Sequence, residues 1–165
     1  MGFIANYMMI DEPTLDRFMT LDGEDLVEAI DELEEAKNNV VYCMDKLWDG
    51  LHFLLTGVSA SNPIEDHKLS ESVVGVHVFD AEDFVACSEY DELAGIVSEL
   101  EKVNMGELLD NVDFDQFTKK KIYPDIWYND QKIQLGKELS QEWEGLLEFY
   151  RQAIQKKAHV IVSIY

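Results

Sequence analysis

The amino-acid sequence predicts a single α/β domain in which about five strands pack against helices. The 165-residue chain has an ordinary length for one domain, and no linker, internal repeat or shift in composition divides residues 1–165. Hydrophobic residues make up 47 % of the chain and charged residues 28 %, as in ordinary globular proteins. Short apolar runs alternate with longer segments whose apolar residues recur at helical spacing, which is the pattern of an α/β fold.

The first part of the chain predicts one strand followed by two helices. Residues 1–10 mix aromatic and branched apolar side chains, as strands do. Asp11 and Pro13 suit the start of a short helix, because Asp can cap a helix and Pro fits its first turn. A second helix begins after Asp22, and its apolar residues keep helical spacing: Leu26, Val27, Ile30 and Leu33. Its other faces are rich in Asp and Glu, so we expect an acidic outer surface.

The next segment predicts a strand and a central helix. Residues 40–44 form a short strand-like apolar run. Asp45 can cap a third helix that extends through Leu55 and ends at Gly57, because glycine readily adopts the left-handed conformation of a helix end. This helix is apolar nearly all round, so we expect it near the centre of the fold. Residues 58–72 predict a polar connection with turns.

Three further strands are expected, at residues 73–79, 84–87 and 159–165. Gly75, inside the first of them, indicates a bulge or a close approach of another backbone. The last of them is almost continuously apolar, which is typical of a strand covered on both faces.

Two longer helices lie between these strands. Ser88 and Asp91 form a capping-box pattern ahead of apolar residues at helical spacing: Leu93, Ile96, Val97 and Leu100. Short helical turns near residues 108–109 and 114–117 lead to a connection that contains Pro124. A long final helix is expected over residues 132–157, directly before the last strand.

Acidic residues give the chain a formal net charge of −21. Residues 11–35 hold eleven Asp or Glu and one basic residue, and residues 80–115 hold twelve Asp or Glu and one basic residue. Binding to nucleic acid is disfavoured, because phosphate contacts need clusters of basic side chains. The acidic stretches are either a solvated surface that favours solubility or a face that docks a basic protein partner.

The sequence favours a cytoplasmic protein. No apolar run approaches the length of a membrane helix, and the first residues do not form an export signal. The two cysteines, Cys43 and Cys87, lie in apolar surroundings, where buried and reduced thiols are expected. Assembly into a homo-oligomer is possible on this sequence.

Asp49 and His52 are the first candidates for chemistry, because residues three apart share one face of a helix. A carboxylate and an imidazole at this spacing can bind a metal ion or exchange protons. No nearby motif supplies a third ligand, so we predict no metal ion and no cofactor. The alternative is that His52 is a buried, hydrogen-bonded core histidine.

Aromatic residues suggest a ligand pocket beside the same helix. Trp48 and His52 could form one wall, with Tyr123 and Trp127 opposite, because ligand sites are often lined by aromatic side chains. The alternative is that Trp48 and Tyr123 fill the core between this helix and the sheet. His77 joins the candidate pocket because it alternates with valines on a predicted strand, where it could face a cavity.

Four segments together resemble the YfbM-like family of bacterial proteins. Residues 45–57, which read DKLWDGLHFLLTG, are the most specific of them. The others are MGFIANY at residues 1–7, LSESVVGVH at residues 69–77 and IYP at residues 122–124. The resemblance implies a three-layer α/β sandwich with a mixed sheet, and it implies no activity, cofactor or catalytic residue.

Two functional hypotheses follow. The chain lacks the usual catalytic motifs, so the first is a non-enzymatic acidic module, of inhibitor or immunity type, that binds a basic protein surface. The second is a small-molecule-binding protein or enzyme with a cleft beside Trp48, Asp49 and His52, and it requires His52 to be partly accessible.

Overall fold

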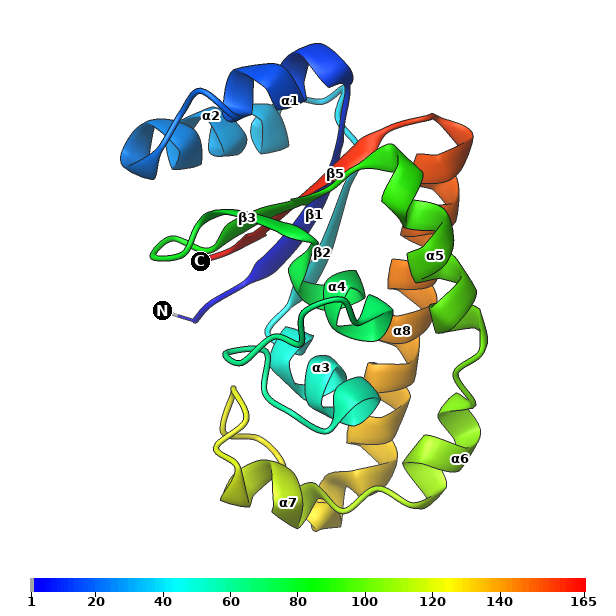
Figure 1. Cartoon of the computed structure of the whole chain (residues 1–165). Coiled ribbons are helices and arrows are strands. Elements are labelled where there is room, and N and C mark those ends of the chain that lie inside the picture. The colour runs from blue at the N-terminus through cyan, green and yellow to red at the C-terminus, as the bar shows by residue number, and fades with distance from the viewer. Residues whose placement is uncertain (1) are drawn as a thin grey trace.

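A five-stranded antiparallel sheet forms the centre of the computed structural model, which describes residues 2–165 (Figure 1). Its strands are β1 (Ala5–Ile10), β2 (Val41–Asp45), β3 (His77–Asp80), β4 (Val85–Ser88) and β5 (His159–Ile164). The strand order is β2-β1-β5-β4-β3, and every neighbouring pair is antiparallel. The resemblance had implied a mixed sheet, and this expectation is wrong because all neighbouring strands are antiparallel. Two helices follow β1 and bring the chain back to the C-terminal end of β1. The next strand, β2, therefore runs antiparallel to β1 (Figure 1).

One face of the sheet is covered by the α1–α2 layer, which consists of α1 (Glu12–Phe18) and α2 (Gly23–Glu35) (Figure 1). Both helices begin where the sequence predicts, and the Asp11 side chain accepts a hydrogen bond from the Thr14 N–H at the start of α1. Their buried residues pack on side chains of β1, β4 and β5 in a small core: Met8, Ile10, Leu15, Phe18, Leu26, Ala29, Ile30, Val85, Cys87 and Ile161.

The α3–α8 layer covers the other face and contains the larger core (Figure 1). Its helices are α3 (Trp48–Thr56), α4 (Lys68–Val74), α5 (Tyr90–Glu101), α6 (Met105–Asp110), α7 (Phe114–Lys119) and α8 (Lys132–Gln155), with the 3₁₀ turn η1 (Asn129–Gln131) before α8. The fold is thus a three-layer sandwich, as the resemblance implied. In β5, Val160 and Val162 face the larger core and Ile161 faces the smaller one, which confirms that this strand is buried on both faces.

The start of α3 differs from the sequence-based expectation. Asp45 is the last residue of β2 and does not cap the helix; Leu47 precedes α3 instead. The expected end is confirmed, because Gly57 closes α3 with a left-handed φ of 81°. No residue of α3 is exposed, which confirms its expected position inside the fold.

The sequence-based assignment around residues 68–76 is wrong. A helix, α4, replaces the end of the expected polar connection, and β3 starts only at His77. Contacts from the rest of the fold hold this helix, because the hydroxyls of Tyr7 and Tyr150 donate to the carbonyls of Val73 and Ser72, both at 2.6 Å. Such contacts override the weak helix propensity of serine and valine.

Gly75 ends α4 with a φ of 79°, and a Cβ built on it would lie 2.9 Å from Ala86 Cβ. The expected close approach at Gly75 is therefore confirmed. The capping box of α5 lies one residue later than expected, with Glu89 at the N-cap and Glu92 three residues on. Ser88 belongs to β4, where it is fully buried, and its hydroxyl has no hydrogen-bond partner within residues 2–165. Within the same residues, no helix has the length and apolarity needed to cross a membrane.

Candidate functional site

Trp48 and Tyr123, two residues of the predicted pocket, lie against each other at the start of α3. Their rings stack with centroids 5.5 Å apart. The Trp48 indole N–H donates to the Phe3 carbonyl at 3.0 Å, and the Phe3 N–H donates to the Tyr123 hydroxyl at 2.9 Å. Both aromatic side chains thus hold the segment before β1 in place, and contact with a ligand at this position stays a prediction.

Asp49 is buried directly beneath this aromatic pair. Its Oδ2 accepts from the Tyr123 N–H at 2.8 Å, and its Oδ1 accepts from the Ser59 hydroxyl at 3.0 Å and the Ala60 N–H at 2.7 Å. Three hydrogen bonds to one carboxylate join α3 to two separate loops. Both carboxylate oxygens are therefore engaged in holding the fold.

His52 is fully buried, at 0 % exposure, so the expectation of a partly accessible imidazole is wrong. Its Nδ1 lies 2.8 Å from the Val58 carbonyl and its Nε2 lies 2.7 Å from the Ser70 hydroxyl. A carbonyl can only accept, so Nδ1 carries the proton and Nε2 accepts from Ser70. Burial lowers the pKa of His52, which favours this neutral form. The alternative interpretation, a hydrogen-bonded core histidine, is confirmed.

Trp127 also belongs to the core rather than to a cleft wall. It is buried, its indole N–H donates to the Ile122 carbonyl at 3.0 Å, and its ring stacks on Phe114 with centroids 5.7 Å apart. The ring leaves no room at Gly50, because a Cβ added there would overlap with the Trp127 ring atoms. The expectation that Trp127 lines a cleft is therefore wrong.

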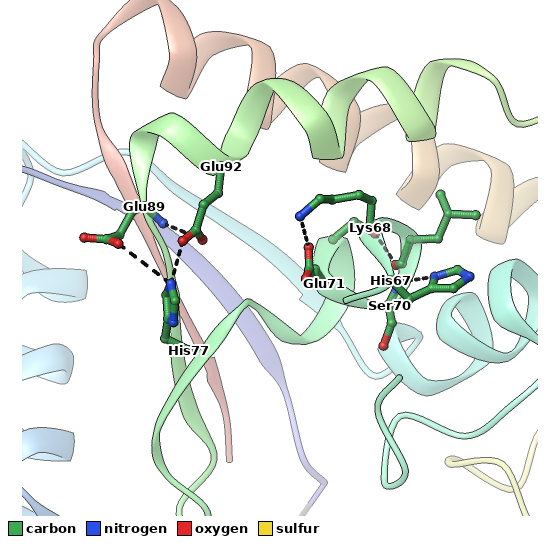
Figure 2. A network of polar contacts seen from close by, with 9 residues as sticks. His67, Lys68, Ser70, Glu71, His77, Glu89 and Glu92 are labelled. Carbon is green, nitrogen blue, oxygen red and sulfur yellow. Dashed lines mark hydrogen bonds and ion pairs between the residues drawn. The ribbon is translucent and has the colours of Figure 1, made fainter. Parts of the chain in front are cut away.

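His77 lies apart from these residues, in a cluster with two carboxylates (Figure 2). Its Nε2 is 2.5 Å from Glu92 Oε1 and 3.7 Å from Glu89 Oε2. The three groups form the only set of three or more potential metal ligands found within residues 2–165. We call His77, Glu89 and Glu92 the His–Glu–Glu cluster.

Pairing of β3 with β4 assembles this cluster. His77 opposes Cys87 in the register, so it lies close to the point where the chain leaves β4 and enters α5. Glu92 Oε2 accepts from the Glu89 N–H at 3.3 Å, which orients the first turn of α5. Sequence reasoning missed this cluster because His77 is twelve residues from Glu89. The one local signal is the glutamate pair three residues apart at the helix start.

A pocket of about 210 Å³ borders the His–Glu–Glu cluster. His77 and Glu89 line it together with four mainly apolar residues: Leu15, Met19, Phe79 and Cys87. Burial, together with the charges of Glu89 and Glu92, raises the pKa of the Cys87 thiol to about 12, so this thiol stays protonated. Cys43 and Cys87 are both free, as expected. Cys87 is buried, but Cys43 is exposed, so the expectation of a buried thiol is wrong at Cys43.

Outside this cluster, α2 carries a cleft lined by carboxylates, which we call the acidic cleft. Its volume is about 500 Å³, and six of its eight lining residues are acidic: Glu24, Glu28, Asp31, Glu32, Glu35 and Asp83. Val27 and Tyr165 are the other two. Within residues 2–165, none of these six carboxylates has a basic partner within 4 Å.

Comparison with known proteins agrees with this fold. Residues 1–163 match the family model DUF1877, described as a domain of unknown function. The chain is 26 % identical to Protein YfbM of Escherichia coli (strain K12) over 167 aligned residues, which cover 99 % of each chain. A crystal structure of YfbM from Escherichia coli, titled a protein of unknown function, matches with a TM-score of 0.81 and covers 98 % of this chain and 99 % of that chain. The resemblance seen in residues 45–57 is thereby confirmed, and the chain belongs to the DUF1877 family.

Proposed function

We propose that the protein is a non-enzymatic interaction module whose acidic cleft binds a basic segment of a partner protein. The observation that carries this proposal is the unpaired charge on α2. Six carboxylates surround one cleft, and no basic side chain of the described residues neutralises them. The free thiols of Cys43 and Cys87 favour a reducing compartment such as the cytoplasm as the place of action.

The charges on α2 cost the protein stability. Seven of the 13 residues of α2 are acidic, and like charges four residues apart on a helix repel, as in Glu24–Glu28 and Glu28–Glu32. Glu34 and Glu35 end the helix, where the negative end of the helix dipole disfavours further negative charge. A bound basic segment would relieve both effects.

The lining of the cleft also favours a particular chemistry of the partner. Val27 and Tyr165 add apolar surface between the carboxylates. Tyr165 is oriented by its hydroxyl, which donates to Asp31 Oδ1 at 2.7 Å. A segment with Lys or Arg on one side and apolar residues on the other complements this surface. A second copy of this chain does not, because its net charge of −21 would repel the cleft.

Binding can be measured by fluorescence anisotropy with a labelled amphipathic peptide that carries Lys and Arg on one face and Leu on the other. We expect binding at low salt that weakens steeply as the salt concentration rises, because exposed charges are screened. A peptide with Glu in place of Lys and Arg should not bind. The proposal is wrong if the basic peptide does not bind at low salt or if its affinity ignores salt.

Two variants with equal charge test whether α2 is the binding surface. The first carries four Glu→Gln substitutions in the acidic cleft, at Glu24, Glu28, Glu32 and Glu35. The control neutralises four exposed carboxylates elsewhere: Asp91→Asn, Asp110→Asn, Asp130→Asn and Glu144→Gln. The cleft variant should bind the peptide at least about tenfold more weakly than the control. Equal losses would show a general effect of net charge and would contradict a role for the cleft.

A further inference from the structure

We propose that the His–Glu–Glu cluster binds a divalent transition-metal ion of the zinc class. The cluster offers one imidazole nitrogen and two carboxylate oxygens, all within 4.8 Å of one another. Imidazole and carboxylate are common ligands of Zn²⁺, and three protein ligands with one open position are typical of reactive rather than structural zinc sites.

The distances allow a metal ion with small side-chain movements. Zinc–nitrogen and zinc–oxygen bonds of about 2.0–2.1 Å place neighbouring ligand atoms of a tetrahedral site about 3.3 Å apart. The 2.5 Å contact between His77 Nε2 and Glu92 Oε1 would widen, and the 3.7 Å distance to Glu89 Oε2 would shorten. Both glutamates and His77 have exposed surface, so these rotamer changes meet little resistance.

The charge balance of the cluster also favours a divalent ion. A proton on His77 can offset only one of the two carboxylates, whereas a divalent cation offsets both. Lys68, the basic side chain on the neighbouring helix α4, pairs with Glu71 at 2.7 Å (Figure 2).

The pocket beside the cluster is the second, independent observation. His77 and Glu89 belong to the cluster and also line the 210 Å³ pocket, whose other walls are mainly apolar. An apolar pocket with a few convergent polar groups is the usual form of a small-ligand site. A metal ion held by the cluster would border this pocket, because two of its three ligands line it. The fitting ligand is a small molecule with a metal-binding oxygen or nitrogen and a compact apolar body.

The test is isothermal titration calorimetry of the chelator-treated full chain with Zn²⁺, in the presence of excess Mg²⁺ to occupy weak carboxylate sites. We expect one zinc ion per chain, with weaker binding at acidic pH because the ion competes with a proton for His77. Co²⁺ should give the visible absorption bands of a low-coordinate site. Absence of zinc binding, or binding that excess Mg²⁺ abolishes, would overturn the proposal.

Three single variants and one control locate the site. His77→Gln, Glu89→Gln and Glu92→Gln should each weaken zinc binding by at least about tenfold. Glu92→Gln keeps an oxygen that can accept from the Glu89 N–H, so the helix start is preserved. Glu12→Gln is the matched control, because Glu12 makes the same 2.5 Å contact with His159 but no second carboxylate of residues 2–165 joins that pair. Unchanged binding in Glu92→Gln, or an equal loss in Glu12→Gln, would contradict the assignment.

Discussion

The helices α2 and α5 lie on opposite faces of the sheet and use their acidic residues in different ways. On α5, three of the four carboxylates have partners: Glu92 contacts His77, Glu99 pairs with Lys102 at 2.7 Å, and Glu101 pairs with Arg151 at 3.1 Å. On α2, no carboxylate has a basic partner within 4 Å among residues 2–165. The acidic stretches that contain these helices, residues 11–35 and 80–115, have similar net charge in the sequence, but their carboxylates have different roles in the structure.

This difference separates charge that serves the fold from charge that is available to a partner. The ion pairs of α5 tie it to α8 and to β3, next to a large core. The α1–α2 layer rests on a smaller core and keeps most of its charges toward solvent, with Glu34 as the carboxylate of α2 that contacts the sheet. We therefore expect the α3–α8 layer to be intolerant of changes in packing and the α1–α2 layer to respond to changes in charge.

The largest effect should come from Gly50→Ala in the α3–α8 layer. The new methyl group would overlap with the Trp127 ring, which is held by its hydrogen bond to Ile122. Overpacking at such a site should lower the free energy of unfolding by about 3 kcal/mol, measured by urea denaturation. Gly95→Ala in α5 is the control, because its nearest neighbour is the flexible end of Lys68 at 3.4 Å. That variant should be neutral or gain up to about 1 kcal/mol; similar losses in both would contradict tight packing against Trp127.

A change of charge at one residue should act in opposite directions in the two layers. Glu28→Lys replaces repulsion from Glu24 and Glu32 by attraction and should raise the free energy of unfolding by about 0.5 kcal/mol. Arg151→Gln in α8 removes the partner of Glu101 and should lower the free energy by about 0.5 kcal/mol. Both effects should shrink in 0.5 M salt, a concentration at which the screening length is only about 4 Å. A loss of stability in Glu28→Lys would show that α2 is not under charge repulsion.

The smallest effect should be a change in pH dependence. Glu34 on α2 and Glu142 on α8 are half-buried carboxylates that each contact the sheet, and burial raises the pKa of both above 4.5. A raised folded-state pKa contributes stability at low pH that is lost as the pH rises through that pKa. Glu34→Gln and Glu142→Gln should each remove part of this loss. The free energy of unfolding of each variant, relative to wild type, should therefore increase from about pH 4 to pH 7.

Urea denaturation at several pH values measures this change. His52 titrates in the same way in all three proteins, so its contribution cancels in the comparison. A pH-independent difference between wild type and either variant would contradict the raised pKa of that residue.

Local patterns in the sequence predict much of this fold. Helices α2, α5 and α8 are recognised from apolar residues at helical spacing, and β5 from its continuous apolar run. Helix α4 is missed because its stabilising contacts come from Tyr7 and Tyr150, which are distant in sequence. The order of the strands and their antiparallel pairing also depend on contacts between distant segments.

The candidate sites also divide into features that a local sequence pattern predicts and features that depend on contacts between distant segments. The sequence correctly indicates that α2 has an acidic outer face. It places Tyr123 opposite Trp48 across a cleft, whereas the two rings stack on each other. It does not place His77 beside Glu92, because that contact depends on the register of β3 with β4. Residues that are brought together only by strand pairing show no characteristic spacing in the sequence.

The position of β5 has a consequence for how the protein is made in the cell. Residues 159–164 are inserted between β1 and β4 and join the two halves of the sheet. While the ribosome has not yet released these residues, β1–β2 and β3–β4 are separate two-stranded ribbons, which are marginally stable alone. The sheet can therefore close only after residues 159–164 have left the ribosome, and a chain that stops before residue 159 exposes both ribbons to proteases and chaperones.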